Sequence, residues 1–525
     1  MSTDAVDTHH WDEHTELVVA GSGGAGLTGA YTSAASGLQT TVLEKTAYLG
    51  GTTAYSGSGL WLPGNDVLTR SGIADSVELG LEYFRAAVGD RTPKDLQQAY
   101  VSTGPELVRF LEEDPSLAFE HHPFPDYYPL PGRFDLGRAI FPRPVERSEL
   151  GPLEGLVRPT IPVDTFGVED AAAGETLSGG QALIARLLLA IHSTGNAVLR
   201  TSSPLLELVK DNGRVVGVVY SKNGVRTRLR ATHGVLLAAG GFECNTEMRR
   251  EQHGLDGSDW TAAPAGSNTG QAMLAAIDIA AATDLFEEAW WVPSLLFPNG
   301  RAAFIVGLSG GVFVDHHGQR FANEAKPYDQ MGHELKKHYE LNGGPQSVWW
   351  IFDDTHPTPP ALISPTPERG EFSQSGLWKS ATTIRELAEM TGLPQDALEE
   401  TIKKFNVQCE QGVDTDFARG EDPYDLFFGA GTGPNSALVP VKRGPFHAVR
   451  IVLGDLGTKG GLQIDIDGRV LGLDGSAIEG LYAAGNNAAS VTGHVYPGPG
   501  APIGTGMVWG YRAALHAAKS AMTLI

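Results

Sequence analysis

A glycine-rich turn near the start of the chain has the residue types and spacing of a dinucleotide-binding site. The turn, Gly21-Ser-Gly-Gly-Ala-Gly26, follows an apolar run, and Glu44 lies eighteen positions after Gly26. Glycines permit a tight turn and let the backbone approach a pyrophosphate, whose charge the N-terminus of the following helix stabilises. An acidic side chain at this distance can accept hydrogen bonds from a ribose diol. These residues predict dinucleotide binding.

The elements around the turn must form a βαβ unit if they are to position these groups. Glu16–Ala20 is a short apolar run typical of a buried strand, the Ala-rich stretch after the turn predicts a helix to about Ser36, and Thr40–Leu43 predicts a second strand. The alternative is a glycine-rich turn in an ordinary α/β sheet, with Glu44 as a solvated charge at a strand end. Strand, helix and acidic residue together favour the dinucleotide site.

Two later apolar segments fit the same domain. Gly234–Gly241 reads as a buried strand that ends at glycines, and Gly480–Asn486 is a similar strand followed by a small-residue turn. We therefore predict an α/β fold in which a Rossmann-like nucleotide-binding domain is assembled from both chain ends, residues 1–288 and 458–525. An α+β catalytic domain, residues 289–457, is inserted between them.

Three further segments complete the prediction of structure. Leu205–Tyr220, with its Asp211-Asn212-Gly213 turn, is typical of a β-hairpin. Asp396–Gln411 has a helical pattern. Pro123–Pro162 is rich in proline and aromatic residues without clear periodicity, and we interpret it as a loop.

The glycine motif alone does not separate NAD from FAD, but two other small-residue segments favour FAD. Gly50–Gly57 follows the second strand and would let the backbone pass close to a flavin. Gly498–Gly506 precedes a helix-like stretch, Met507–Thr523, whose N-terminus could stabilise negative charge on a reduced flavin. Taken singly, each segment is also compatible with an ordinary connecting loop.

Several motifs make the sequence recognisable as a whole. They are Gly21–Gly26 with Glu44-Lys45, Gly51–Gly57, Phe124–Tyr128, Gly240–Phe242, Asn323–Gln330, Asp455–Gly461, Gly480–Asn486 and Tyr496–Gly500. With these motifs the chain resembles the bacterial 3-ketosteroid Δ1-dehydrogenases, flavoproteins related to the fumarate reductase flavoprotein group. The nucleotide motif is shared by many flavoproteins, whereas the tyrosine-bearing motifs are much more specific.

The resemblance implies a reaction and roles for four residues. A 3-ketosteroid such as androst-4-ene-3,17-dione would lose a proton from C2 and a hydride from C1, the hydride going to the flavin. By similarity, the Tyr496 hydroxyl and the Gly500 N–H would hold the ketone oxygen, where enolate charge develops. Tyr328 would be the base, and Tyr127 would hydrogen-bond to it. Tyr128, adjacent to Tyr127, is the residue with which Tyr127 is most easily confused.

The resemblance also implies tightly but non-covalently bound FAD, and an electron acceptor that is a quinone or a carrier protein. Together with the glycine motifs it predicts these cofactor-binding residues: Gly21, Ser22, Gly23, Gly24, Ala25, Gly26, Glu44, Lys45, Thr46, Gly51, Thr52, Thr53, Ser56, Gly57, Ala239, Gly240, Gly485, Asn486, Pro502 and Ile503.

Three rival functions stay open at this stage. A fumarate-reductase-like enzyme would need arginines and histidines converging on two carboxylates. A 3-ketosteroid 4(5)-dehydrogenase would share the steroid but remove other hydrogens. A flavin-binding module without turnover would keep the cofactor site and lack an acid, base or oxyanion group.

Charge and hydropathy exclude several classes of partner. The net charge of −23 would repel phosphate backbones and anionic lipid surfaces, so we expect no nucleic acid partner. No apolar run approaches the roughly 18–20 residues of a membrane span. Met1–Glu16 has no apolar region typical of an export signal. We expect a cytoplasmic protein, while membrane association through a partner stays open.

The cysteines and histidines predict no metal site. Cys244 and Cys409 cannot build a disulfide framework or a structural zinc site. The pairs His9-His10, His121-His122 and His316-His317 resemble metal ligands, but no third ligand has a suitable spacing. We expect these histidines to lie at the surface.

Overall fold

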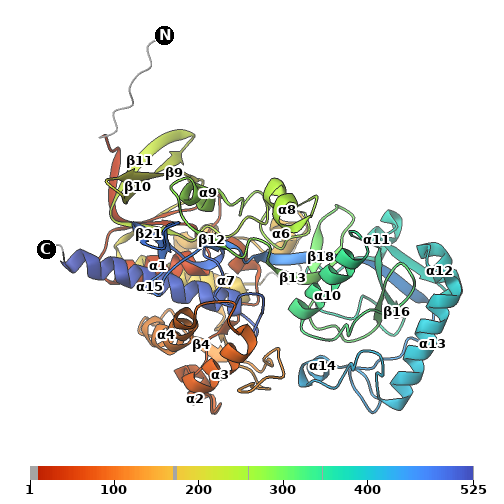
Figure 1. Ribbon diagram of the computed structural model, residues 1–525. Coiled ribbons are helices and arrows are strands. Elements are labelled where there is room, and N and C mark those ends of the chain that lie inside the picture. Colours follow the sequence, from red (N-terminus) through yellow and green to blue (C-terminus); the bar gives the residue numbers. More distant parts are fainter. Residues whose placement is uncertain (1–9, 170–173, 258, 346, 524–525) are drawn as a thin grey trace, which may run out of the picture.

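The computed structural model describes residues 10–169, 174–257, 259–345 and 347–523. Two large β-sheets organise the chain, and Figure 1 shows them in two parts connected by β13 and the long strand β18. The expected strand character of Glu16–Ala20 and Thr40–Leu43 is confirmed by β1 and β2, and the expected helix by α1. Residues 1–9, which hold His9 and most of the N-terminal stretch examined for an export signal, lie outside the described residues, whereas His10 is described and exposed.

The first sheet has eight strands, five of which run parallel in the order β21-β11-β1-β2-β8. Their bounds are β1 Glu13–Ala20, β2 Thr40–Leu43, β8 Ala197–Arg200, β11 Val225–Leu237 and β21 Ala477–Ala483. The pairing of Val235 with both Val18 and Leu481 joins segments from the two chain ends in one sheet. The predicted α/β class, with a nucleotide-type sheet assembled from both ends of the chain, is confirmed.

Antiparallel strands extend this sheet at its edges. A hairpin adds to β11, and a short strand adds to β21: β9 Leu205–Asp211, β10 Arg214–Lys222 and β20 Arg469–Leu471. Asn212 and Gly213 in the hairpin turn have φ values of 46° and 85°. Positive φ at both central residues is the requirement of a type I′ turn, so the predicted hairpin is confirmed.

Helices packed on one another and on the sheet carry the cofactor-side loops. Helix α1 (Gly24–Ala35) contacts both α15 (Ala501–Thr523) and α7 (Gly179–Thr194), and Figure 1 shows α1 and α15 side by side. Helix α15 begins at Ala501, so the expectation that the helix starts after Gly506 was wrong. Glycines inside α15 are tolerated because the helix packs closely: a Cβ on Gly506 would lie 3.2 Å from the Ala25 Cβ.

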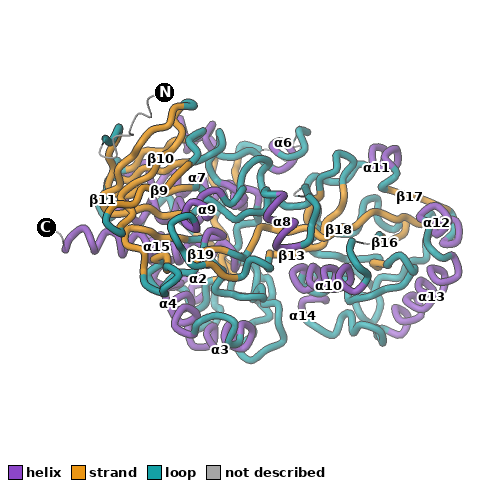
Figure 2. Tube along the Cα trace, turned by 45° about the horizontal axis from the view of Figure 1, so that its top comes forward, coloured by secondary structure: helices purple, strands orange, loops and turns teal. Residues whose placement is uncertain are grey.

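The second sheet is antiparallel and has the order β14-β13-β18-β16-β15, with β17 also paired to β18. Its strands are β13 Ala289–Leu296, β14 Ala302–Phe304, β15 Val312–Val314, β16 Val348–Asp353, β17 Trp378–Ala381 and β18 Phe446–Thr458. Its helices are α10 Tyr328–Leu341, α11 Arg369–Ser375, α12 Ile384–Thr391, α13 Gln395–Gln411 and α14 Pro423–Phe427. Figure 2 shows α10, α12 and α13 around these strands. The predicted helix over Asp396–Gln411 is confirmed, and the domain boundaries at 288/289 and 457/458 stay a prediction.

The remaining elements lie mostly beside the first sheet. Between Leu60 and Pro142 they are β3 Leu60–Trp61, α2 Asp66–Arg70, α3 Val77–Val88, α4 Lys94–Glu112, β4 Phe119–His121 and β5 Ala139–Pro142. The others are η1 Gly51–Tyr55, β6 Val145–Glu146, α5 Arg147–Leu150, η2 Gly151–Leu156, α6 Ile161–Asp164, β7 Thr176–Leu177, α8 Thr246–His253, α9 Gln271–Ile277, β12 Thr283–Asp284, β19 Gly461–Leu462 and η3 Gly485–Asn487.

The interpretation of Pro123–Pro162 as loop was wrong in part. The stretch contains β5, β6, α5, η2 and the start of α6. Strand β5 pairs with β3 and β4, so its partners come from elsewhere in the chain. Elements this short show no usable periodicity, because long-range pairing rather than their own pattern holds them.

Both cysteines are free thiols. Among the described residues, no helix combines the length and the apolar character needed to cross a bilayer.

Candidate active site

An elongated cavity of about 610 Å³ runs from the glycine turn to the tyrosine-bearing loops. Of the predicted cofactor-binding residues, all but Gly26 and Thr46 line it. The predicted Tyr328, Tyr496 and Gly500 line it as well, whereas Tyr127 does not. The cavity therefore brings together segments from both ends of the chain and from the start of α10.

The glycine turn and Glu44 form one end of this cavity. The Glu44 carboxylate accepts hydrogen bonds from the Ser22 hydroxyl (2.6 Å) and from the backbone N–H (2.7 Å) and hydroxyl (2.8 Å) of Thr46. Thr46 thus orients Glu44 from outside the cavity. A Cβ on Gly26 would lie 2.2 Å from the Gly21 carbonyl oxygen, so the lack of a side chain at Gly26 lets helix α1 pack closely against the turn after β1. This cradle fits a dinucleotide.

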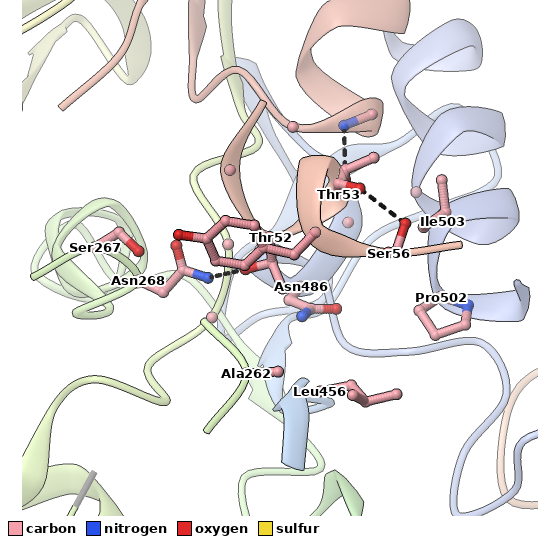
Figure 3. A pocket seen from close by; sticks show the side chains of 18 of the residues that line it. Thr52, Thr53, Ser56, Ala262, Ser267, Asn268, Leu456, Asn486, Pro502 and Ile503 are labelled. Atoms are coloured by element: carbon pink, nitrogen blue, oxygen red, sulfur yellow. Dashed lines mark hydrogen bonds between the residues drawn. The ribbon is translucent and has the colours of Figure 1, made fainter. Parts of the chain in front are cut away.

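The loop after β2 and a segment from the middle of the chain form the two facing walls. Figure 3 shows Asn268 beside Thr52, and the Asn268 side-chain amide donates to the Thr52 hydroxyl at 3.1 Å. The same amide donates to Glu243 at 2.5 Å, and burial raises the pKa of that carboxyl to about 7. Sequence reasoning missed Asn268 and Glu243, because no periodicity or glycine motif marks their place beside the cofactor site.

Three buried tyrosines form a cluster at the other end. The Tyr127 hydroxyl donates to the Tyr328 hydroxyl at 2.7 Å. The ring centroids of Tyr328 and Tyr496 are 5.4 Å apart and their planes nearly perpendicular, and the centroids of Tyr127 and Tyr496 are also 5.4 Å apart. Tyr128 lies elsewhere, with its hydroxyl 3.5 Å from the Asp329 carboxylate. The structure thus pairs Tyr127, and not Tyr128, with Tyr328.

Three different elements place these tyrosines. Tyr328 is the first residue of α10, and Tyr496 lies in the loop before α15. The Tyr127 N–H donates to the Pro497 carbonyl at 3.0 Å, which ties the two tyrosine-bearing loops together. Gly500 has a φ of +85°, and a Cβ there would lie 1.9 Å from the Gly59 carbonyl oxygen. The backbone at Gly500 therefore requires glycine.

Burial dominates the acidity of the cluster. It raises the pKa of Tyr328 well above 10, while the hydrogen bond from Tyr127 acts in the opposite direction. It also raises the pKa of Tyr496, and hydrogen bonds from Tyr328 and the Gly500 N–H oppose this rise. Both phenols are therefore protonated at neutral pH in the absence of ligands, and the bond from Tyr127 favours the phenolate of Tyr328.

A group of buried charges lies behind the cluster. Lys459 is fully buried; its ammonium donates to the Val495 carbonyl (3.0 Å) and lies 4.3 Å from the centre of the Trp290 ring, which packs against Tyr496. Burial lowers the pKa of Lys459, and the negative charges of Asp329 and Glu288 oppose that shift. Sequence reasoning assigned no role to Lys459 or Asp329, although both lie in motifs that carry the family resemblance.

His333 and His494 complete the partners of Glu288. Burial alone would raise the Glu288 pKa, but hydrogen bonds from these two histidines and the charge of Lys459 lower it. The His494 Nδ1 lies 2.8 Å from the Glu288 carboxylate, and His333 contacts the same carboxylate at 3.3 Å. Glu288 is therefore ionised across the pH range in which enzymes work.

Apolar and aromatic side chains form the walls beside the tyrosines. Phe124 and Phe304 line the cavity, and the Phe304 ring lies 4.8 Å from that of Tyr328. Among the described lining residues, the charged side chains are Glu44, Lys45 and Arg158. Arg158 donates to Asp164 and Thr46, on the Glu44 side. The tyrosine end is thus suited to an apolar ring system.

Comparison with known proteins places the chain in a family. Residues 16–503 match the FAD binding domain family. The chain is 38% identical to 3-oxosteroid 1-dehydrogenase of Mycolicibacterium smegmatis (96% of this chain, 97% of the relative) and 41% identical to that of Rhodococcus opacus (97% and 99%). This chain belongs to the 3-oxosteroid 1-dehydrogenase family.

A solved structure from the same family agrees with this assignment. The crystal structure of 3-ketosteroid Δ1-dehydrogenase from Sterolibacterium denitrificans, in complex with 1,4-androstadiene-3,17-dione, superposes with a TM-score of 0.89. It has 31% sequence identity and covers 97% of this chain and 100% of that one. The predicted family, fold class and cofactor, FAD, are confirmed for this 3-oxosteroid 1-dehydrogenase family member. The residue roles stay predictions.

Proposed function

We propose that this 3-oxosteroid 1-dehydrogenase family member removes the C1 and C2 hydrogens of 3-ketosteroids, with androst-4-ene-3,17-dione as a representative substrate. The observation that carries the proposal is the hydrogen-bonded pair Tyr127–Tyr328 beside Tyr496, at the apolar end of the FAD-type cavity. When bound, FAD supplies the acceptor for the hydride from C1.

Tyr496 and Gly500 hold the substrate ketone in this proposal. The α-proton of a ketone becomes removable when the negative charge developing on its oxygen is stabilised. The raised pKa of Tyr496 keeps its hydroxyl protonated, so that it can donate a hydrogen bond. The Gly500 N–H is held close to that hydroxyl by a backbone conformation that only glycine tolerates. Both donors line the cavity.

Tyr328 removes the proton from C2. Forming a phenolate at pH 7 from a pKa near 10 costs about 4 kcal/mol, at about 1.36 kcal/mol per pKa unit. Burial increases that cost, and the hydrogen bond from Tyr127 offsets part of it. The phenolate is thus a minor species at neutral pH, and the rate should follow its population.

The rival functions fit the cavity less well. A dicarboxylate site needs several cationic side chains around the substrate. In the described part of the chain, the arginine and lysine that line the cavity are Arg158 and Lys45, and their hydrogen bonds include those to Thr46 and Thr269 and none to the tyrosine cluster. A flavin module without turnover would not need the Tyr127–Tyr328 pair. A 3-ketosteroid 4(5)-dehydrogenase would act on the same steroid, and identification of the product distinguishes it from the proposed enzyme.

Two further parts of the proposal concern the electrons and the flavin. Turnover requires an acceptor for two electrons, and we propose a quinone or a carrier protein. We also propose that FAD is held non-covalently by the glycine turn, Glu44, Thr52 and Thr53. These residues line the cavity and offer backbone that can lie close to the cofactor and groups that can hydrogen-bond to it.

The deciding experiment compares steroid with dicarboxylate. The purified flavin-loaded protein is mixed anaerobically with androst-4-ene-3,17-dione or with succinate, and flavin bleaching is followed. We expect bleaching by the steroid alone, with a 1,4-diene-3-one as the product. Bleaching by succinate, bleaching by neither compound, or a product altered at C4–C5 would each contradict the proposal.

Tyr328→Phe tests the base in the same assay. Loss of a positioned general base typically costs about 10²–10⁴-fold in rate. Tyr339→Phe is the matched control, because Tyr339 is a buried tyrosine of the same helix that does not line the cavity. Desaturation by fully loaded Tyr328→Phe at the rate of the control would rule out Tyr328 as the base.

A further inference from the structure

A turn and a helix end on the second sheet bring together three side chains that can ligate a metal. Asp315 and His316 follow β15, and His338 lies in the last turn of α10. A donor atom of each lies within 4.8 Å of the donor atoms of the other two. We propose that Asp315, His316 and His338 bind one divalent transition-metal ion. Zinc suits this imidazole and carboxylate set. None of the three residues lines the cofactor cavity.

The imidazole nitrogens give the first argument. The His316 Nδ1 and the His338 Nε2 are shielded from solvent, and among the described residues neither has a hydrogen-bond partner. A buried polar atom left without a partner costs about 1–3 kcal/mol. A cation ligated by these two nitrogens would supply the missing partner of each.

The supporting contacts of the ligands give the second argument. The Asp315 carboxylate is buried, and its Oδ1 accepts the backbone N–H groups of His317 (2.9 Å) and Gln319 (3.1 Å). This leaves Oδ2 for a metal. The His338 ring stacks on Phe321, with centroids 4.5 Å apart and planes 23° apart. Metal ligands are commonly oriented by such outer contacts, which fix the carboxylate and the ring before the ion arrives.

The spacing requires only a local adjustment. Zinc–nitrogen distances of about 2.0–2.1 Å place tetrahedral ligand atoms about 3.4 Å apart. The donor atoms, which lie within 4.8 Å of one another, would reach that spacing by rotation of the two histidine side chains, and a water molecule would complete four-coordination. A cation is also favoured at the C-terminal end of α10 by the helix dipole.

The bound ion would join two segments that flank the proposed base. The turn after β15 precedes the loop that leads into Tyr328, and His338 lies in the last turn of the helix that begins at Tyr328. A metal bridge between them would fix this loop and helix as one unit and stabilise the second sheet. The third ligand was missed in the sequence because His338 is twenty-two positions after His316, a spacing that only the packing of α10 brings together.

Metal analysis of the flavin-loaded protein tests the site. The protein is stripped with a chelator, dialysed against Zn²⁺ or Co²⁺, and its metal content and Co²⁺ absorption spectrum are measured. The variants are His338→Gln and Asp315→Asn, and His192→Gln is the control because His192 is an exposed histidine at the end of α7. Flavin absorbance confirms that each variant is folded.

We expect one ion per chain for the wild type and His192→Gln, and affinity weaker by at least about tenfold in the two ligand variants. A wild type that binds no ion would overturn the proposal. So would His338→Gln and Asp315→Asn proteins that bind as the wild type does, because the ion would then lie elsewhere on the chain.

Discussion

The Tyr127 hydroxyl donates a 2.7 Å hydrogen bond to the Tyr328 hydroxyl, although the two residues are 201 positions apart in the chain. Tyr328 begins α10, and the backbone of Tyr127 is held by Pro497 in the loop that carries Tyr496. Because the bond is donated to the oxygen that would lose its proton, it stabilises the phenolate of Tyr328. The pair therefore joins two distant parts of the chain in the proton-transfer unit that we propose.

Replacing Tyr127 by phenylalanine removes this bond. A hydrogen bond to a charged group contributes about 1.5–3 kcal/mol, so we expect kcat at neutral pH to fall by about 10- to 100-fold. The Tyr328 pKa should rise, and because both proteins lie below that pKa from pH 7 to about 9, the fold loss should stay the same across this range. Stopped-flow flavin reduction across pH measures the loss and its pH dependence, with Tyr339→Phe as the control. A Tyr127→Phe enzyme that reduces its flavin at the rate of the control would contradict this role.

The pH dependence of the wild type follows from burial. In the proposed mechanism the phenolate form of Tyr328 is the active base, and burial holds the pKa of Tyr328 well above 10. Below that pKa the phenolate population increases tenfold for each pH unit, so kcat/KM should rise steadily from neutral pH to about pH 9, which is still below the free phenol pKa. A flat kcat/KM profile over this range would count against a tyrosine base.

Lys459 should matter for stability because its ammonium is fully buried near Asp329 and Glu288. Lys459→Met leaves both carboxylates without the charge that lowers their pKa values. Removing one partner of buried charges costs about 3 kcal/mol in unfolding free energy. Urea unfolding measures this, and Lys403→Met, at a side chain 76% exposed, should change stability by less than about 0.5 kcal/mol.

The sign of the pH effect on that variant is fixed by linkage. Without Lys459 the folded-state pKa values of Asp329 and Glu288 rise relative to those of the wild type. At low pH the two carboxyl groups of the variant are protonated, so no uncompensated charge is buried. As pH increases they ionise, and the buried negative charge destabilises the variant. The stability gap between wild type and Lys459→Met should thus widen from about pH 4 upward. A gap that narrows with increasing pH would show that these carboxylates do not depend on Lys459.

Gly26→Ala should abolish flavin retention. The new Cβ would lie 2.2 Å from the Gly21 carbonyl oxygen, so the turn and helix α1 must separate. Gly155→Ala is the control, because a Cβ there meets no atom within 4 Å. The flavin-to-protein absorbance ratio after purification measures the effect. Full flavin content in Gly26→Ala would mean that the cradle does not depend on this close approach.

Local sequence patterns were sufficient to predict the elements that have clear periodicity or a characteristic turn. The strand–turn–helix from Glu16 to Ser36, the hairpin around Asn212-Gly213 and the helix ending at Gln411 follow from periodicity and turn chemistry. The structure differs from these predictions where an element pairs or packs with segments that are distant in the sequence. Strand β5 exists because β3 and β4 pair with it, and the glycines of the first turns of α15 are helical because α1 packs there.

For the active site, the sequence by itself determined that a βαβ dinucleotide cradle exists, and its motifs identified the family and the tyrosines. Only the tertiary structure decided which tyrosine meets Tyr328, and that Lys459, Asp329 and Glu288 lie together behind Tyr496. The same holds for His338 beside Asp315. The reason is physical: backbone patterns act over a few residues, whereas side chains separated by twenty to several hundred positions meet only after packing has fixed the chain between them.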